Sequence, residues 1–221
     1  MSDAGSELPL VLLGAGGHAK VLLSVARSLN RLVLGVCDPQ LFLSGVTQWR
    51  GLDVLGGDEA LLQFDSGSIL AMNGIGQTVS SAARRKVYER VTADGYHFAT
   101  LVHPSAWVDS SVELHEGVQV MAGSIIQADV VIGENSIINT RSSVDHDCVV
   151  GAHSHIAPGA TLCGGVRVGE RCFVASGATV IQGIVIGNDA VIGAGSVLVR
   201  DVTSHGIVLG SKPRFGTLAD K

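Results

Sequence analysis

Aromatic residues, basic charge and long apolar runs are all scarce in this chain. Aromatics make up 4% of its 221 residues although 46% are hydrophobic, so a core built on large rings is not expected. The net charge of −5 argues against nucleic acid as the main partner, because no basic surplus can neutralise phosphates. No apolar run approaches the roughly 20 residues that span a bilayer, so membrane insertion is not expected.

Cysteine is rare too, and no two of the four cysteines form a CxxC pair. Cys148 and Cys172 fall at small positions of the repeat described below, so buried free thiols are the favoured interpretation over catalytic ones. The first residues lack the basic segment of a secretion signal. We therefore expect a cytoplasmic protein in a reducing environment.

A six-residue repeat dominates the second half of the chain. An aliphatic residue returns at every sixth position from Val102 to Leu198, and the position four residues after each holds only Ala, Val, Ser, Cys or Ile. Neither a helix nor a lone strand has a period of six. The pattern predicts a parallel β-helix whose triangular coil of about 18 residues stacks residue n on residue n+18.

The first half alternates between strand-like and helix-like patterns. Apolar runs predict strands over residues 8–13, 31–37, 68–72 and 97–102, and helices are expected after the first glycine turn and over residues 77–94, with Arg84, Arg85, Lys86, Glu89 and Arg90 on a polar face. Alternation of this kind indicates a small parallel sheet with Rossmann-like winding. We expect a Rossmann-like domain over residues 1–101, a β-helix over 102–202 and a C-terminal capping tail over 203–221.

The predicted strands end at or beside glycine or aspartate, which indicates a ligand crevice. Ligands of parallel sheets bind beyond the carboxyl ends of the strands. The glycine turn matches a dinucleotide fingerprint only once, and His18 stands where the backbone would approach a pyrophosphate. Binding of the nucleotide part of a substrate is favoured over NAD, and a purely structural turn stays open. The candidate residues are Gly14, Gly16, Gly17, His18, Asp38, Pro39 and Gly74.

The strongest polar cluster of the repeat runs from Asn139 to Asp147. His146 follows the inward-facing Val144 by two positions and should lie at a corner of the coil, where Asp147 could orient it as a general base. An ordinary surface histidine is the alternative. The 18-residue spacing places Gly164 one coil above His146, and its backbone N–H could stabilise an oxyanion in acyl transfer.

A metal centre is not expected in the repeat. Ligands stacked on one face should lie about 18 or 36 positions apart. No pair has that spacing among His103, His115, His146, His153 and His155.

Three segments together resemble one known family. Leu13–Val21, the Asn139–Asp147 cluster and Gly210-Ser211-Lys212-Pro213 are similar to the sialic-acid O-acetyltransferase-like branch of the left-handed β-helix acyltransferases. Members of that branch N-acetylate nucleotide-linked 4-amino-4,6-dideoxy sugars such as UDP-linked bacillosamine precursors and GDP-perosamine. The resemblance implies a left-handed β-helix, a homotrimer, acetyl-CoA as co-substrate without a metal, and a nucleotide-linked amino sugar as acceptor.

The same resemblance implies roles for individual residues. His146 would be the base, Asp147 its acidic partner and Gly164 a catalytic neighbour, while Asn139 would lie near the sugar. His155, Gly164 and Ala194 would contact acetyl-CoA, and the turn from Gly14 to His18 with Asp38 would hold the nucleotide sugar. O-acetylation of a sugar hydroxyl by the same machinery and a non-catalytic β-helix scaffold are the alternative functions.

Overall fold

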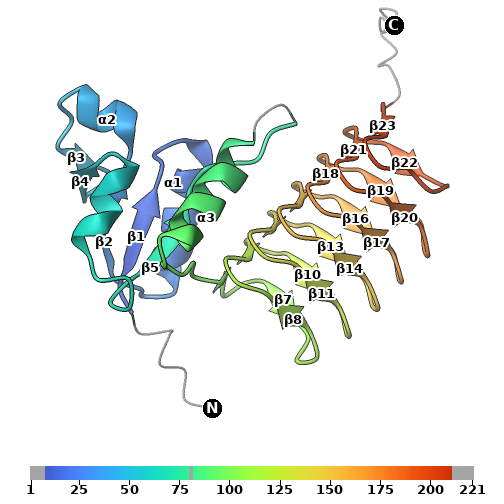
Figure 1. Cartoon of the computed structure of the whole chain (residues 1–221). Coiled ribbons are helices and arrows are strands. Elements are labelled where there is room, and N and C mark those ends of the chain that lie inside the picture. The colour runs from blue at the N-terminus through green and yellow to red at the C-terminus, as the bar shows by residue number, and fades with distance from the viewer. Residues whose placement is uncertain (1–7, 80–81, 211–221) are drawn as a thin grey trace, which may run out of the picture.

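The computed structural model describes residues 8–79 and 82–210, which form an α/β domain followed by a parallel β-helix (Figure 1). The domain contains one sheet in the order β3-β4-β2-β1-β5, parallel except for the β3–β4 hairpin. Its strands are β1 (Leu10–Leu13), β2 (Val33–Cys37), β3 (Gln48–Trp49), β4 (Leu52–Gly56) and β5 (Leu70–Asn73). The strand pairing confirms the Rossmann-like winding.

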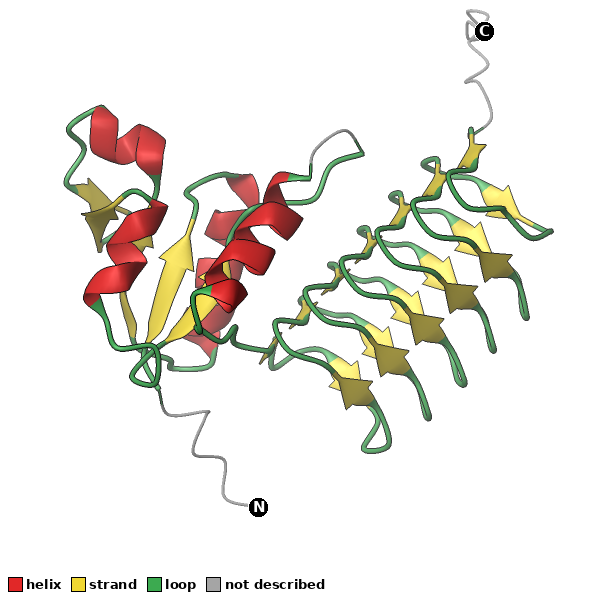
Figure 2. Ribbon diagram, viewed as in Figure 1, coloured by secondary structure: helices red, strands yellow, loops and turns green. Residues whose placement is uncertain are grey.

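Helices flank this sheet (Figure 2). They are α1 (Gly17–Ser28), α2 (Pro39–Leu43), the 3₁₀ helix η1 (Asp58–Gln63) and α3 (Ala83–Ala93). The helix predicted over 77–94 was too long, because residues 77–79 run as a loop along the β-helix and the Gln77 side chain reaches the Cys172 carbonyl at 3.5 Å. Among the described residues no helix is long and apolar enough to cross a membrane.

The strand predicted over 97–102 was also wrong in its placement. Phe98 makes only an isolated bridge to Ala71 at the edge of the domain sheet. Leu101 and Val102 form β6, which pairs with Gln119 and Val120 of the β-helix instead. Val102 already follows the six-residue repeat, so stacking on Val120 decides its partner.

The β-helix consists of two-residue strands in three parallel sheets. The domain-facing sheet, which packs on the α/β domain, holds β6 (Leu101–Val102), β9 (Gln119–Val120), β12 (Ile137–Ile138), β15 (His155–Ile156), β18 (Phe173–Val174), β21 (Val191–Ile192) and β23 (Ile207–Val208). The second sheet holds β7 (Trp107–Val108), β10 (Ile125–Ile126), β13 (Ser143–Val144), β16 (Thr161–Leu162), β19 (Thr179–Val180) and β22 (Val197–Leu198). The third holds β8 (Glu113–Leu114), β11 (Val131–Ile132), β14 (Val149–Val150), β17 (Arg167–Val168) and β20 (Val185–Ile186).

The chain passes from the domain-facing sheet to the second and then to the third sheet in every coil. We name the turn after the domain-facing sheet the first corner, the turn after the second sheet the second corner, and the turn that returns to the domain-facing sheet the third corner. Val144 pairs with Ile126 below and Leu162 above, which confirms the 18-residue register. The coils form a left-handed parallel β-helix, as predicted.

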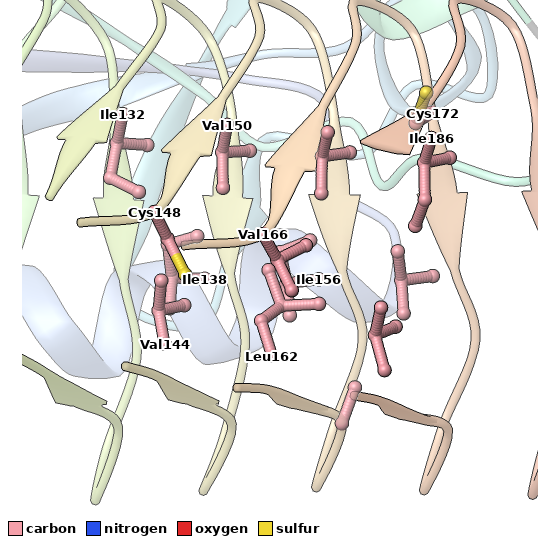
Figure 3. Close-up of a cluster of buried hydrophobic side chains, with 14 of the residues drawn as sticks. Ile132, Ile138, Val144, Cys148, Val150, Ile156, Leu162, Val166, Cys172 and Ile186 are labelled. Carbon is pink, nitrogen blue, oxygen red and sulfur yellow. The ribbon is translucent and has the colours of Figure 1, made fainter. Parts of the chain in front are cut away.

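Both repeating positions point into the prism (Figure 3). Ile138, Val144 and Leu162 are fully buried, and so are Cys148 and Cys172 at the small positions. All four cysteines are free thiols, with Cys163 partly exposed. Aliphatic stacking of this kind replaces the aromatic core that the composition excluded.

The last coil departs from the register. Ile186 pairs with Val202 and Ile192 with Val208, each 16 positions further on. The turn after Leu198 is therefore shorter than the turns below it. The expected capping tail covers residues 203–221. Within it, Ile207 and Val208 form β23 and extend the domain-facing sheet, and residues 211–221 lie outside the described residues.

Candidate active site

His146 lies at the second corner, between β13 and β14. Its side chain is 62% exposed, and its Nδ1 lies 2.7 Å from Oδ2 of Asp147. The hydrogen bond to Asp147 raises the pKa of His146, with a further contribution from the charge of Asp145. Because Nδ1 is engaged by Asp147, the free nitrogen is Nε2, which can accept a proton from a substrate.

Gly164 lies directly above this imidazole, as the 18-residue register predicted. A Cβ added to Gly164 would lie 2.6 Å from Nε2 of His146, so the close approach requires glycine. The N–H of the next residue, Gly165, donates to the His146 carbonyl at 2.8 Å. Within residues 8–79 and 82–210 the Gly164 N–H has no hydrogen-bond acceptor. An imidazole with a free Nε2 and a glycine whose N–H has no acceptor in the described part of the chain thus lie close together.

Asn139 and His155 form a second polar pair, at the first corner and on β15. The backbone N–H of Thr140 donates to Asn139 Oδ1 at 2.7 Å, which fixes the amide so that Nδ2 points to Nε2 of His155 at 2.9 Å. His155 Nε2 therefore accepts, and the hydrogen of the neutral ring resides on Nδ1.

The Nδ1 of His155 is buried and makes no well-formed hydrogen bond within the described residues, although the backbone of Gln77 interacts with the ring. Burial, and then the nearby charge of Arg84, lower the pKa of His155 to about 4. The ring is neutral at physiological pH. An orphaned buried donor of this kind costs free energy unless a ligand or water accepts its hydrogen.

The glycine turn opens the amino end of α1. Gly14 has a positive φ of 87°, and Gly16 provides no side-chain cap for α1. A Cβ at Gly16 or Gly17 would meet nothing within 4 Å, so the space before the helix is open. A helix amino terminus with access of this kind favours anions.

Asp38 joins the parts of the predicted crevice. Its Oδ2 accepts from the Ala15 N–H at 2.8 Å, and its Oδ1 accepts from the N–H groups of Gln40 and Leu41 at the start of α2. Pro39 occupies the first turn of that helix. The carboxylate thus has a structural role that sequence reasoning missed, because it ties the glycine turn to α2.

Two further predicted residues make close packing contacts. A Cβ at Gly74 would lie 2.8 Å from both Leu13 O and Leu12 Cδ1, so glycine is needed there for packing of the crevice floor. Ala194 is exposed at the first corner above β21. The space beside its carbonyl is filled by Gly210, where a Cβ would clash with that oxygen.

One chain does not bring all the predicted residues together. His146, Asp147 and Gly164 lie at the second corner, which in a triangular prism is opposite the domain-facing sheet. Asn139, His155 and Ala194 lie on that sheet or at the first corner, and the glycine turn lies on the domain packed against it. The predicted site therefore separates into two groups on different sides of the β-helix.

His18 connects the domain to the β-helix. Its Nε2 lies 2.7 Å from Oε1 of Gln119 on β9. Burial lowers its pKa to about 3, assisted by the charge of Arg84. His18 is therefore neutral. It lies at the amino end of α1, next to the open space that favours anions.

Arg84 is the residue that sequence reasoning misplaced. It was expected on a polar helix face, but it is 2% exposed. Its guanidinium donates to the carbonyls of Asn73, Ile75 and Asn135 at 2.8, 3.0 and 3.2 Å, and burial lowers its pKa to about 9. It therefore clamps the loop after β5 to the β-helix. Among the described residues no group of three or more His, Cys, Asp or Glu could hold a metal ion.

Comparisons with known proteins agree with this architecture. The PglD N-terminal domain matches residues 9–91, and the bacterial transferase hexapeptide repeat matches four overlapping segments between residues 111 and 200. No curated protein sequence gave a significant match.

Solved structures match over nearly the whole chain. PerB from Caulobacter crescentus, in complex with CoA and GDP-perosamine, is 39% identical, with 91% of this chain and 94% of that chain covered and a TM-score of 0.83. The acetyltransferase domain of PglB from Neisseria gonorrhoeae, in complex with acetyl coenzyme A, is 31% identical, with coverages of 92% and 97% and a TM-score of 0.85. WeeI from Acinetobacter baumannii, 22% identical with coverages of 91% and 96% and a TM-score of 0.75, shares the fold. The chain therefore belongs to the nucleotide-sugar N-acetyltransferases of the PglD and PerB type.

Proposed function

We propose that this enzyme transfers the acetyl group of acetyl-CoA to the 4-amino group of a UDP- or GDP-linked 4-amino-4,6-dideoxy sugar. The observation that carries the proposal is the stacking of Gly164 on the His146 imidazole, with a Gly164 N–H that has no acceptor within residues 8–79 and 82–210. The complexes of PerB with CoA and GDP-perosamine and of the PglB domain with acetyl coenzyme A support the substrate classes.

In the proposed reaction the sugar amine attacks the thioester carbonyl directly, without an acyl-enzyme. His146 Nε2 accepts the proton that the amine loses, and Asp147 stabilises the resulting imidazolium. The carbonyl oxygen becomes an oxyanion that accepts a hydrogen bond from the Gly164 N–H. Collapse of this intermediate forms the amide and breaks the C–S bond, and the departing CoA thiolate can take the proton back from His146.

The second group of residues fits the two substrates. The buried Nδ1–H of His155 makes no well-formed hydrogen bond within the described residues, and it would donate to acetyl-CoA. Ala194 would contact the cofactor further along the first corner. The open amino end of α1 would bind the diphosphate, since helix termini attract anions. Asn139 would lie near the sugar, and Asp38, Pro39 and Gly74 would shape the nucleotide crevice.

A homotrimer would unite the two groups. The second corner of one subunit would face the first corner of its neighbour, so that His146 and His155 of different chains meet at one site. Mixing inactive His146→Ala and Asn139→Ala subunits tests this arrangement. Random trimers should regain about a quarter of the wild-type sites, whereas no recovery would show that each chain acts alone.

The free thiols agree with a cytoplasmic, reducing location.

The acceptor atom is tested with matched nucleotide sugars that carry NH₂ or OH at C4. Release of free thiol from acetyl-CoA reports each reaction. We expect the amine to react faster by orders of magnitude, because it is more nucleophilic and the hydroxyl cannot repeat its hydrogen bonds. Comparable acetylation of the hydroxyl compound would favour a sugar O-acetyltransferase, and no acetylation of either would leave the scaffold alternative.

A further inference from the structure

A cavity lies between the α/β domain and the β-helix. It occupies about 250 Å³ between the amino end of α3, residues 77–79 and the third corner of the β-helix. The third-corner residues stack one above another, 18 positions apart. Its lining residues are Gln77, Thr78, Val79, Ala82, Arg84, Arg85, Asn135, His153, Arg171 and Asp189. The candidate residues at the second corner and those of the glycine turn and the nucleotide crevice are not among them.

Positive charge exceeds negative charge in this lining, although the whole chain is acidic. Arg84, Arg85 and Arg171 contribute three guanidinium groups, and Asp189 is the one carboxylate among the lining residues. Asp189 is engaged by Arg171 in a two-pronged pair at 2.8 and 2.9 Å. Asp189 also interacts with the charge of Arg85, and Glu170 pairs with Arg171 at 2.6 Å. Arg84 is the lining arginine that has no acidic partner among the described residues.

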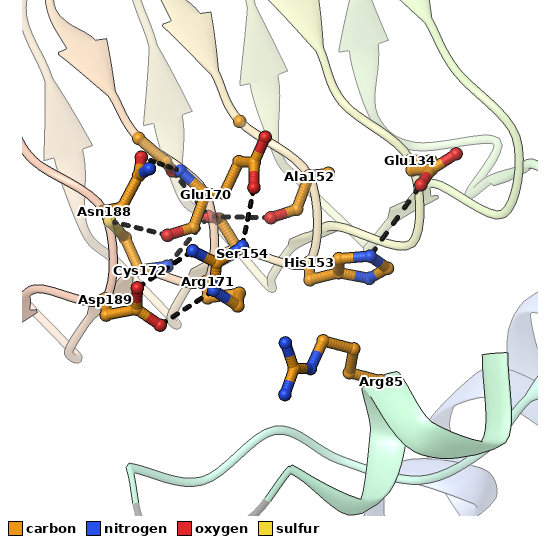
Figure 4. Close-up of polar contacts among 12 residues, drawn as sticks. Arg85, Glu134, Ala152, His153, Ser154, Glu170, Arg171, Cys172, Asn188 and Asp189 are labelled. Atoms are coloured by element: carbon orange, nitrogen blue, oxygen red, sulfur yellow. Dashed lines mark hydrogen bonds and ion pairs between the residues drawn. The ribbon is translucent and has the colours of Figure 1, made fainter. Parts of the chain in front are cut away.

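Arg84 and Arg85 both have donors to offer. Arg84 is almost fully buried without a carboxylate partner among the described residues, and its Nη2 makes no hydrogen bond. Arg85 approaches Glu89 only at 3.8 Å in an exposed pair, an arrangement that contributes little stability. Figure 4 shows the Arg85 guanidinium directed from α3 toward the β-helix, with no interaction drawn to its neighbours.

His153 lines the cavity as a neutral ring whose tautomer is fixed by a chain of amides. The Ile75 N–H donates to Asn73 Oδ1, Asn73 Nδ2 donates to Asn135 Oδ1, and Asn135 Nδ2 therefore faces Nδ1 of His153 at 3.0 Å. The ring hydrogen resides on Nε2, which lies 3.7 Å from Glu134, too far for a good hydrogen bond. Burial lowers the pKa of His153; the charges of Glu134 and Glu89 oppose this shift, and those of Arg85 and Arg84 add to it.

We propose that this cavity, which we call the α3 pocket, binds a small phosphate-bearing anion at a site separate from that of the nucleotide sugar. Arg85 and the Nη2 of Arg84 would donate to the phosphate oxygens, as guanidinium groups do in charge-assisted pairs. The cavity is smaller than the roughly 300–1,000 Å³ of pockets for drug-sized ligands. A phosphate or diphosphate group with a small organic body therefore fits it better than a whole nucleotide sugar.

Isothermal titration of the full-length protein with inorganic phosphate and with pyrophosphate tests the proposal. We expect saturable binding of one anion per chain, weakened by about tenfold or more in Arg85→Gln, since charge-assisted bonds are the strong ones. Arg90→Gln is the matched control, because Arg90 lies on the same helix outside the pocket and pairs with Asp58. Thermal melting should show that both variants fold.

Three results would overturn the assignment. One is the absence of binding up to about 10 mM, a concentration that corresponds to negligible affinity. Another is equal weakening in Arg85→Gln and Arg90→Gln, which would reveal attraction by general charge. The third combines two observations: a nucleoside diphosphate displaces the anion completely, and the Arg85→Gln variant binds that nucleotide as tightly as the wild-type protein does. This result would place the anion in the nucleotide crevice. Binding that persists beside the nucleotide supports the α3 pocket.

Discussion

The imidazole of His146 lies so close beneath Gly164 that an added Cβ would approach its Nε2 to 2.6 Å. The contact follows from the coil register, since Val144 pairs with Leu162 and the two residues that follow are stacked in the same way. Gly164→Ala must therefore displace either the imidazole or the coil. We expect kcat to fall by about a hundredfold, a usual cost of misplacing a catalytic group by about 1 Å.

Gly67→Ala provides the control for this substitution. A Cβ at Gly67 would meet only Asp65 Oδ2 at an ordinary 3.7 Å, so kcat and the melting temperature should stay at wild-type values. Steady-state kinetics and thermal melting of both variants decide the matter. Wild-type kcat in Gly164→Ala would show that the close contact has no catalytic role.

Replacing His146 by Ala should lower kcat by about 10²–10⁴, the span typical for loss of a general base. The KM for acetyl-CoA should change little, because His155 and Ala194, which are expected to hold the cofactor, lie away from the second corner, and Gly164 would contact it through its backbone. Folding should survive, since the side chain is 62% exposed. Normal turnover in a properly folded His146→Ala protein would assign the proton to another acceptor.

Asp147 should set the pH at which His146 becomes active. Its hydrogen bond is the largest cause of the raised pKa of His146, and only the deprotonated imidazole can act as a base. The rate should therefore rise as pH increases through that pKa, and Asp147→Asn should move this limb of the kcat/KM profile to lower pH. Asp129→Asn, at the equivalent position one coil below, serves as the control. If the limb does not move in Asp147→Asn, the pH dependence of kcat/KM does not report the protonation of His146.

Substituting Asp38 should raise the KM for the nucleotide sugar more than that for acetyl-CoA. Asp38→Ala also removes the cap of α2 and the hydrogen bond to the Ala15 N–H. This should lower the free energy of unfolding by about 1–2 kcal/mol. Asp38→Asn keeps acceptor capacity and is the better probe. Equal effects on both KM values would indicate general destabilisation and not a nucleotide contact.

The repeat explains why so much of the β-helix could be predicted. A strict period fixes which residues face inward and which stack, so the neighbourhood of His146 and Gly164 follows from spacing alone. The α/β domain has no such rule. Between residues 39 and 67 the short elements α2, β3, β4 and η1 depend on tertiary contacts, and the capping role of Asp38 is visible only once α2 is placed.

Arg84 shows a different limit of the sequence. On a helical wheel it belongs with the charged residues of α3, and its burial depends on three carbonyls from the loop after β5 and the β-helix. No local pattern reveals partners that distant in the chain. The same applies to the buried hydrogen bonds of His18 and His155.

Stability should fall as the solution becomes acidic. The pKa values of His18 and His155 are lowered to about 3 and about 4 in the folded state, whereas in the unfolded chain both protonate near 6.5. Their contribution is present above pH 6.5 and is lost as pH falls toward the folded values, by about 1.4 kcal/mol per pH unit for each histidine. Urea unfolding between pH 7 and 5 measures this slope. It should be shallower in His155→Gln, which removes one of the two histidines with a lowered pKa.

Arg84→Met should destabilise the protein by about 3 kcal/mol or more, because it leaves three carbonyls without their donor and removes a buried group. The matched variant Arg90→Met removes an arginine of the same helix whose pair with Asp58 is partly exposed, and such pairs contribute about 0–1 kcal/mol. Urea unfolding compares the two. Because Arg84 also lowers the pKa of His155, that pKa, followed by NMR, should rise in Arg84→Met and stay fixed in Arg90→Met. Equal unfolding free energies for the two variants would mean that the buried guanidinium does not hold the domain on the β-helix.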